Sequence, residues 1–326
     1  MRIHLPAFLI LLYLSLSPHI FGEKGSGSSA ITLSGAVRLM LEHEPELNAA
    51  EYDTLSSIGD HRLARSELRP QIVLDSSTGY SQRDRSTDGR FRSGQTLLQK
   101  EIGVSLRQLL YDGGVSRNNE RSARNAHLAQ QLTEKSLIEE RVVDLSEVYL
   151  EVLRVRRQIA LAQRNVDDHR TMRDMLQERA RAGGNRADVG LVQGRLQLAL
   201  NTMSTQRLAL NLAEARFERL VGVPPVNLIH PPVPKIPSTV EAIDICRNFD
   251  YLASLEALEA AEHRYEAARA RKKPKVYLDA GLSYGQNSSG IRGDDNEMSA
   301  LVVGSWDIFT GGKNKAYECR EHFQVG

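Results

Sequence analysis

The chain has 326 residues, 41% of them hydrophobic and 25% charged, and its formal net charge is +1. That length suits two domains or one elongated domain, and the near-neutral charge gives no electrostatic argument for nucleic acid as a partner. Aromatic residues make up only 6% of the chain, so a large globular core is not expected.

The first 22 residues predict a signal peptide, 1–22. Arg2 and His4 precede the apolar run LPAFLILLYLSLS, and Gly22 stands at the expected cleavage point. A charged start followed by roughly 7–15 apolar residues is typical of export signals. Beyond this leader the sequence has no apolar run of about 18 residues, the length that a membrane-spanning helix needs. The mature protein is therefore expected to begin near Glu23, outside the cytoplasm.

An internal repeat organises the rest of the chain, with one unit at 23–221 and a second at 240–326. When Pro70 is placed on Pro274, ELRPQIVLDSSTGY matches RKKPKVYLDAGLSY. A second match places LLYDGGVSR, from Leu109, on DIFTGGKNK. Such self-similarity predicts a repeated supersecondary unit. Each unit is expected to run helix, proline, strand, polar loop, strand, Gly-Gly, helix.

The prolines and the glycine pairs mark the predicted junctions between strands and helices. A helix usually ends before the residue preceding a proline, because that residue is pushed toward extended geometry. A Gly-Gly pair can take positive φ and turn the backbone sharply. Asp112 and Thr310, or Ser116 and Asn314, would cap the helix that follows. The junction residues are Pro70, Gly113 and Gly114 in the first unit, and Pro274, Gly311 and Gly312 in the second.

The predicted β-hairpins, 71–111 and 275–309, consist of strands with one apolar and one polar face. In the first strand, for example, Leu74 and Tyr80 fall on one face and Asp75 on the other. This pattern is typical of membrane β-barrel strands, although a half-buried strand of a soluble sheet has the same period. The signal peptide and the polar loops favour the barrel. Four strands cannot close one, and lipid does not tolerate an open edge, so several protomers must share it.

Unusually long helices are predicted between the hairpins. Residues 115–181 contain no Pro or Gly and would form ~100 Å of helix, whereas 186–220 and 240–272 would each form ~50 Å. The Pro-rich linker 222–239 would then lie at mid-height, that is, halfway along the long helix. The last predicted element is the first part of a further helix, 313–326. Apolar residues spaced three and four apart on both arms of the hairpin indicate an antiparallel coiled coil, with a buried globular helix pair as the alternative.

This arrangement resembles the TolC-like outer-membrane efflux and type I secretion proteins from about Ile31 onward. The resemblance rests on LLYDGGVSR, DIFTGGKNKA, HEPELNAA, LRPQI, KKPKV and RARAGGNRADVG. It implies an α+β fold and a homotrimer, in which each protomer gives four strands to one twelve-stranded barrel in outer-membrane lipid, continued by a periplasmic α-helical tunnel. The implied function is a passive exit duct that works with a periplasmic adaptor protein and an inner-membrane transporter.

By the same resemblance, the bend in RARAGGNRADVG is the tip that faces the adaptor. Its residues are Arg181, Gly183, Gly184, Asp188 and Val189. The alternative is that they only close the helical hairpin. We expect no enzyme activity, cofactor or metal site, because the sequence shows no catalytic constellation, phosphate-binding loop or metal-ligand spacing.

The repeat also predicts what should follow Gly312, namely roughly 90–100 residues of a second helical hairpin. The sequence has 14 residues there. We therefore expect a C-terminally truncated member of the family that cannot by itself replace a full-length duct. The rival interpretations are a non-conducting fragment and a periplasmic adaptor or coiled-coil scaffold. An adaptor would need compact β-domains beside its hairpin.

Overall fold

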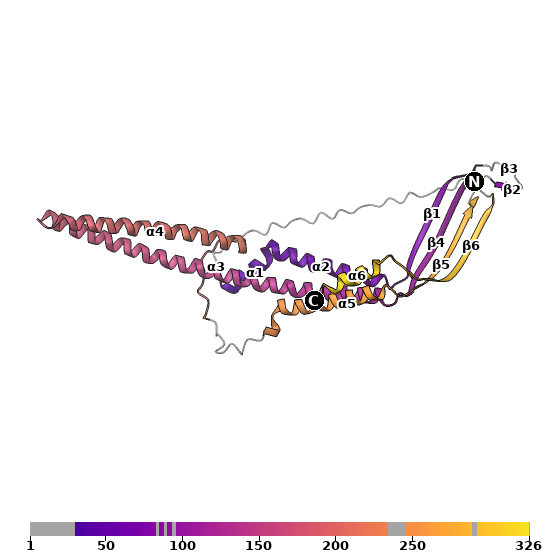
Figure 1. Ribbon diagram of the computed structural model, residues 1–326. Helices are drawn as coiled ribbons and strands as arrows, with labels where there is room; N and C mark the ends of the chain where they lie inside the picture. Colours follow the sequence, from indigo (N-terminus) through magenta and orange to yellow (C-terminus); the bar gives the residue numbers. More distant parts are fainter. Residues whose placement is uncertain are drawn as a thin grey trace, which may run out of the picture.

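The computed structural model describes residues 30–82, 85–87, 90–92, 96–233, 245–288 and 292–325. The predicted signal peptide lies outside these residues. The molecule is elongated, with a four-stranded sheet at one end and a long helical hairpin at the other (Figure 1). Among the described residues, no helix combines the length and the apolar character that are needed to cross a bilayer.

The helices account for most of the length. The long outgoing helix α3 spans the range expected from the sequence, and the return helix α4 is one residue longer than expected. The bounds are α1 Leu33–His43, α2 Pro45–Ser66, α3 Val115–Arg181, α4 Arg186–Val221, the 3-10 turn η2 Ile245–Arg247, α5 Phe249–Ala270 and α6 Lys313–His322.

The helix predicted at 240–272 is shorter than expected. It begins as α5 at Phe249 because the Asn248 side chain accepts a hydrogen bond from the backbone N–H of Tyr251 and caps it. Residues 234–244 lie outside the described part of the chain. At the other end the helix stops at Ala270, since the residue before Pro274 is held near extended geometry. The final helix, predicted at 313–326, likewise ends at His322.

The sheet has the order β1, β4, β5, β6, and each neighbouring pair is antiparallel. A separate two-stranded ribbon of β2 and β3 lies in the loop between β1 and β4. The bounds are β1 Gln71–Ser81, β2 Arg85–Thr87, β3 Arg90–Arg92, β4 Leu97–Tyr111, β5 Lys275–Gln286 and β6 Asp294–Ser305.

The second hairpin ends earlier than predicted, at Ser305 and not at 309. Ser305 pairs with Lys275, the first residue of β5, so β5 offers no partner beyond it. β6 has no neighbour on its other side within the described residues. In contrast, β4 continues to Tyr111 because β5 still pairs with it there. A strand's length is set by its hydrogen-bonding neighbours, and residues 306–309 have none in the described chain.

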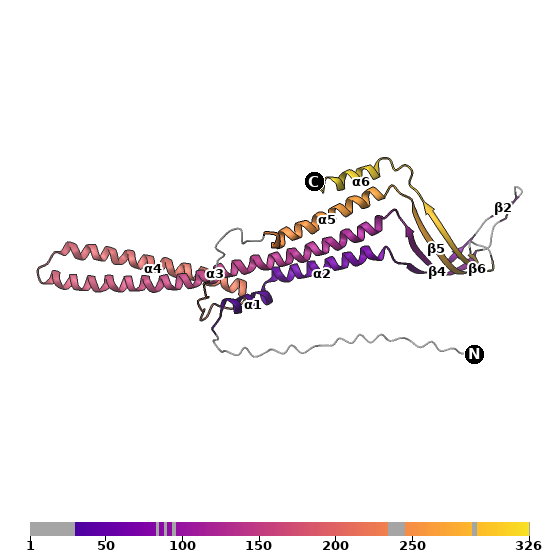
Figure 2. The same ribbon diagram turned by 90° about the horizontal axis from the view of Figure 1, so that it is seen from below.

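Beyond the sheet, the helices that continue from the strands lie side by side, in the order α2, α3, α5, α6 (Figure 2). Polar contacts join the inner pair. Ser122 donates to the carbonyl oxygen of Ala260 at 2.8 Å, and the Asn125 amide donates to the Glu259 carboxylate at 2.6 Å. Small side chains on α5 allow the close approach of α3. Those buried on α5 are Ala253, Ala260, Ala261, Ala267, Ala268 and Ala270.

The main apolar core lies at mid-height, where α1 packs against α3 and α4. Tyr149 and Phe217 are fully buried there, with ring centroids 6.2 Å apart. The Tyr149 hydroxyl lies 2.8 Å from the carbonyl oxygen of Ile31 and 2.5 Å from that of Ile229. These carbonyls belong to two segments that form a parallel bridge between Ile31 and Leu228. The core therefore fastens the start of the described chain and the Pro-rich linker to the long helix.

Candidate functional site: sheet faces, strand–helix junctions and hairpin tip

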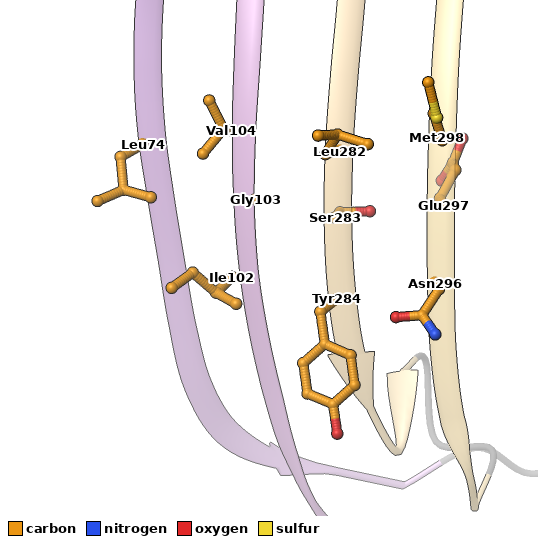
Figure 3. Close-up of a pocket in the computed structure, with 10 residues that line it drawn as sticks. All are labelled: Leu74, Ile102, Gly103, Val104, Leu282, Ser283, Tyr284, Asn296, Glu297 and Met298. Atoms are coloured by element: carbon orange, nitrogen blue, oxygen red, sulfur yellow. The ribbon is translucent and has the colours of Figure 1, made fainter.

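The antiparallel registers bring the apolar side chains of all four strands onto one face of the sheet. Leu74 lies opposite Val104, Val104 opposite Leu282, and Leu282 opposite Met298. Figure 3 shows these four side chains in one row, with Ile102 and Tyr284 in the next. They line a hollow of about 450 Å³. Leu74 is 67% and Met298 83% exposed, so this face is an uncovered apolar surface that spans the whole sheet.

The opposite face carries the polar side chains, such as Asp75 opposite Gly103 and Ser283 opposite Glu297. A second hollow, of about 740 Å³, is lined by polar residues that include Asp75, Glu101 and Glu297 and by apolar residues such as Ile102 and Leu282. A sheet with one apolar and one polar face is the arrangement that a membrane β-barrel needs, with lipid outside and water inside.

One ion pair on the polar face was not foreseen from the sequence. The Arg107 guanidinium donates two hydrogen bonds to Asp279, at 2.8 and 2.9 Å, and lies 5.6 Å from the centre of the Tyr277 ring. The pair joins β4 to β5 and thus the first predicted unit to the second. Only the register places these residues together, because they are 172 positions apart in the chain.

Both glycine pairs lie where the sequence places a strand–helix junction. Gly113, Gly114, Gly311 and Gly312 all have positive φ, between 61° and 98°. A Cβ atom on Gly113 would lie 2.6 Å from the Lys273 side chain, so this glycine also permits close packing of the two units. Pro70 and Pro274 each stand immediately before the first residue of β1 and of β5.

The Asp112 side chain organises the first of these junctions. It is buried and accepts hydrogen bonds from the backbone N–H groups of Gly114 at 2.9 Å and Ser116 at 2.6 Å. In the second junction, the Thr310 hydroxyl accepts from the N–H of Asn314 at 3.4 Å. The formal N-caps are Gly114 and Gly312. The prediction that one of these side-chain pairs provides the N-caps is therefore wrong. Asp112 and Thr310 still accept hydrogen bonds from backbone N–H groups at the helix starts, and Ser116 and Asn314 are among the donors.

Replacing Asp112 by Ala is expected to destabilise the protein by about 1–2 kcal/mol at pH 7. Burial acts to raise the pKa of Asp112, but hydrogen bonds from Ser116, Gly114 and Val115 outweigh it and hold the pKa below its ordinary value. A lowered folded-state pKa gives stability that is present above the unfolded pKa and is lost as the pH falls through the folded one. The difference in thermal unfolding between wild type and variant should therefore begin to shrink as the pH falls below about 4, and should vanish only below the lowered folded-state pKa. A difference independent of pH would contradict the ionised cap.

The tip of the α3–α4 hairpin is a tight and exposed turn. The N–H of Gly184 donates to the carbonyl oxygen of Arg179 at 2.9 Å, and that of Gly183 to Ala180 at 3.2 Å. Gly183 has a φ of +100°. These two bonds and the left-handed residue form a Schellman motif, which ends α3. Asn185 then caps α4 by accepting from the N–H of Ala187 at 3.0 Å.

The side chains at the tip surround a shallow groove between the two helices. The groove has a volume of about 370 Å³, and its lining includes Gln177, Arg181, Arg186 and Val189. Asp188 lies in the first turn of α4. Its negative charge there interacts favourably with the positive end of the helix dipole. The five tip residues named from the sequence therefore lie within one turn of the bend.

The two-faced sheet and the helices that continue from it are the arrangement of an outer-membrane protein with a periplasmic helical extension. The sequence profile of the outer membrane efflux protein family matches residues 36–223, and the chain belongs to that family. The resemblance to TolC-like channels is thereby confirmed.

Two curated relatives and one solved structure illustrate the similarity. Outer membrane efflux protein BepC of Brucella suis is 25% identical over 308 residues, which are 93% of this chain and 66% of BepC. Alkaline protease secretion protein AprF of Pseudomonas aeruginosa is 26% identical, over 88% of this chain and 63% of AprF. The outer membrane protein VceC of Vibrio cholerae has the same fold, with a TM-score of 0.76 at 17% identity over 90% of this chain and 72% of VceC. The chain thus spans about two thirds of the length of these relatives.

Proposed function

We propose that this chain is a protomer of an outer-membrane exit duct for efflux or type I secretion. The observation that carries the proposal is the apolar face that continues across all four strands, joined directly to the helices that lead away from the sheet. An apolar band of this kind is stable only against lipid or another apolar surface. The names of BepC and AprF, one an efflux and one a secretion protein, support the same class of activity.

The duct would be a homotrimer. Within the described chain, β1 and β6 are edge strands, and an unpaired edge in lipid leaves backbone groups without hydrogen bonds. Three copies of a four-stranded sheet would close a twelve-stranded barrel. The two units, 23–221 and 240–326, would then form adjacent segments of its wall, and the linker 222–239 would join them at mid-height.

The hairpin tip would contact a periplasmic adaptor, which would connect the duct to an inner-membrane transporter. The tip lies at the far end of a 67-residue helix, ~100 Å from the sheet. Exposed turns held by a rigid scaffold are where recognition residues gather. The five residues proposed for this contact are Arg181, Gly183, Gly184, Asp188 and Val189.

The test is to express the full chain in a Gram-negative host, extract it from the outer membrane and measure conductance in a planar bilayer. The duct predicts a trimer that migrates faster on gels without heating and that conducts ions. A chain recovered as a soluble periplasmic protein would favour the adaptor or scaffold. A membrane-inserted trimer without conductance would identify a non-conducting scaffold.

A further inference from the structure

The two hairpins of the sheet are built with equivalent contacts. Gln71 lies opposite Arg107 in the first, and Lys275 opposite Ser305 in the second. Aligning Pro70 with Pro274 and Gly113 with Gly311 places these two pairs on each other. The registers of the two hairpins are therefore the same.

A side-chain hydrogen bond is repeated at the same place. The Gln108 amide donates to the carbonyl oxygen of Leu68 at 3.1 Å, and the Trp306 indole N–H donates to that of Lys272 at 3.0 Å. The same alignment places Gln108 on Trp306 and Leu68 on Lys272. The contacts between the first and second units can therefore serve as a template for the contacts of the second unit with its next neighbour.

The second unit lacks such a neighbour in the described chain. In the first unit, Gln108 lies opposite Leu278 of β5, Leu109 opposite Tyr277, and Tyr111 opposite Val276. The residues equivalent to 108–111 are 306–309, which are not in a strand. Their large apolar side chains are uncovered, with Ile308 84% and Phe309 90% exposed.

We infer that β6 pairs with β1 of a second copy of this chain, with Ser305 opposite Asp75 of that copy. The template is Arg107 opposite Asp279, because the alignment places Ser305 on Arg107 and Asp75 on Asp279. In this register residues 306–309 become strand on assembly, against 72–74 of the second copy, with the bulge at Ile308 that the template has at Leu110. This inference rests on the proposed trimer and adds its register.

The inferred register keeps both faces of the sheet continuous across the subunit boundary. Trp306 comes to lie opposite Leu74 of the second copy, on the apolar face, and Ser305 opposite Asp75, on the polar face. A register shifted by one residue would turn the apolar side chains of one strand toward the polar face. The same alignment places α6 of one copy against α2 of the second copy, as α3 lies against α5 within the chain. It would cover Leu63, which is 67% exposed.

Disulfide cross-linking tests the register. In a Cys246→Ser and Cys319→Ser background, the pair Ser305→Cys with Asp75→Cys is expected to give linked dimers and trimers on non-reducing gels. The matched intrachain control is Arg107→Cys with Asp279→Cys, which should link within one chain and give no ladder. The control with a shifted register, Ser305→Cys with Ser77→Cys, should give linked dimers and trimers in at least several-fold lower yield. A trimer that links best through the shifted pair, or through neither pair, overturns the register and leaves the proposed duct intact. Absence of any trimer overturns both.

A gain-of-contact variant removes any dependence on cysteine chemistry. Ser305→Arg would recreate, between copies, the Arg107–Asp279 pair that exists within the chain. It is expected to raise the temperature at which the detergent-solubilised trimer dissociates. In an Asp75→Ser background the same substitution should give no increase. An equal increase in both backgrounds would contradict the inferred pairing.

Discussion

Replacing Gly183 and Gly184 together by proline is expected to reduce the recovery of a bound periplasmic adaptor by roughly tenfold or more, since proline costs ~3 kcal/mol where it breaks helical hydrogen bonds. Gly183 has a φ of +100°, which proline cannot adopt, and both N–H groups that end α3 would be lost. The measurement is the amount of adaptor from the host's own efflux pump that co-purifies with the trimer.

Trimer abundance should remain nearly unchanged in this variant, because the tip is far from the sheet. A charge reversal, Asp188→Lys, tests the side chain with less change to the backbone. Its matched control is Asp168→Lys, an exposed position on α3 several turns away from the tip. Adaptor recovery that is equal in wild type, Asp188→Lys and the double proline variant would show that this end of the hairpin carries no partner contact.

Phe217→Ala is expected to cost about 3–5 kcal/mol of stability, the usual range for deleting a buried aromatic ring. Phe217 is fully buried and packs on Tyr149 in the core that joins α1, α3 and α4. The cavity would weaken the mid-height contact of the helices with the linker. Thermal unfolding followed by the helical circular dichroism signal, together with protease sensitivity of the linker, measures the effect.

The control for this substitution is Leu208→Ala on the same helix. Leu208 is 60% exposed, so its truncation should change stability by no more than about 0.5 kcal/mol. If the two variants unfold at the same temperature, the mid-height core does not hold the helices together as described.

Several features of the fold could be read from short stretches of sequence, because they depend on local backbone preferences. α3 runs from Val115 to Arg181, between the glycine pairs at its two ends and with no Pro or Gly inside. The positive φ angles of Gly113 and Gly312 follow from the absence of a Cβ atom. The alternation of apolar and polar residues along the strands gave the two faces of the sheet.

The tip was placed by the same local rules, since a Gly-Gly bend between two heptad patterns identifies the end of a hairpin. The bonds that end α3 there could not be foreseen in detail. Whether the five tip residues contact a partner depends on another molecule, which the local sequence does not describe, so that role stays a prediction.

Other features were decided only by contacts between distant segments. β6 stops at Ser305 although the apolar pattern continues to Phe309, because strand ends depend on a neighbour and not on propensity. Arg107 meets Asp279, and the Tyr149 hydroxyl meets the carbonyls of Ile31 and Ile229, only once the register and the helix packing are set. Sequence determines local geometry, but strand pairing and burial join residues that are 80 to 172 positions apart in these examples, and their energy is gained only in the assembled fold.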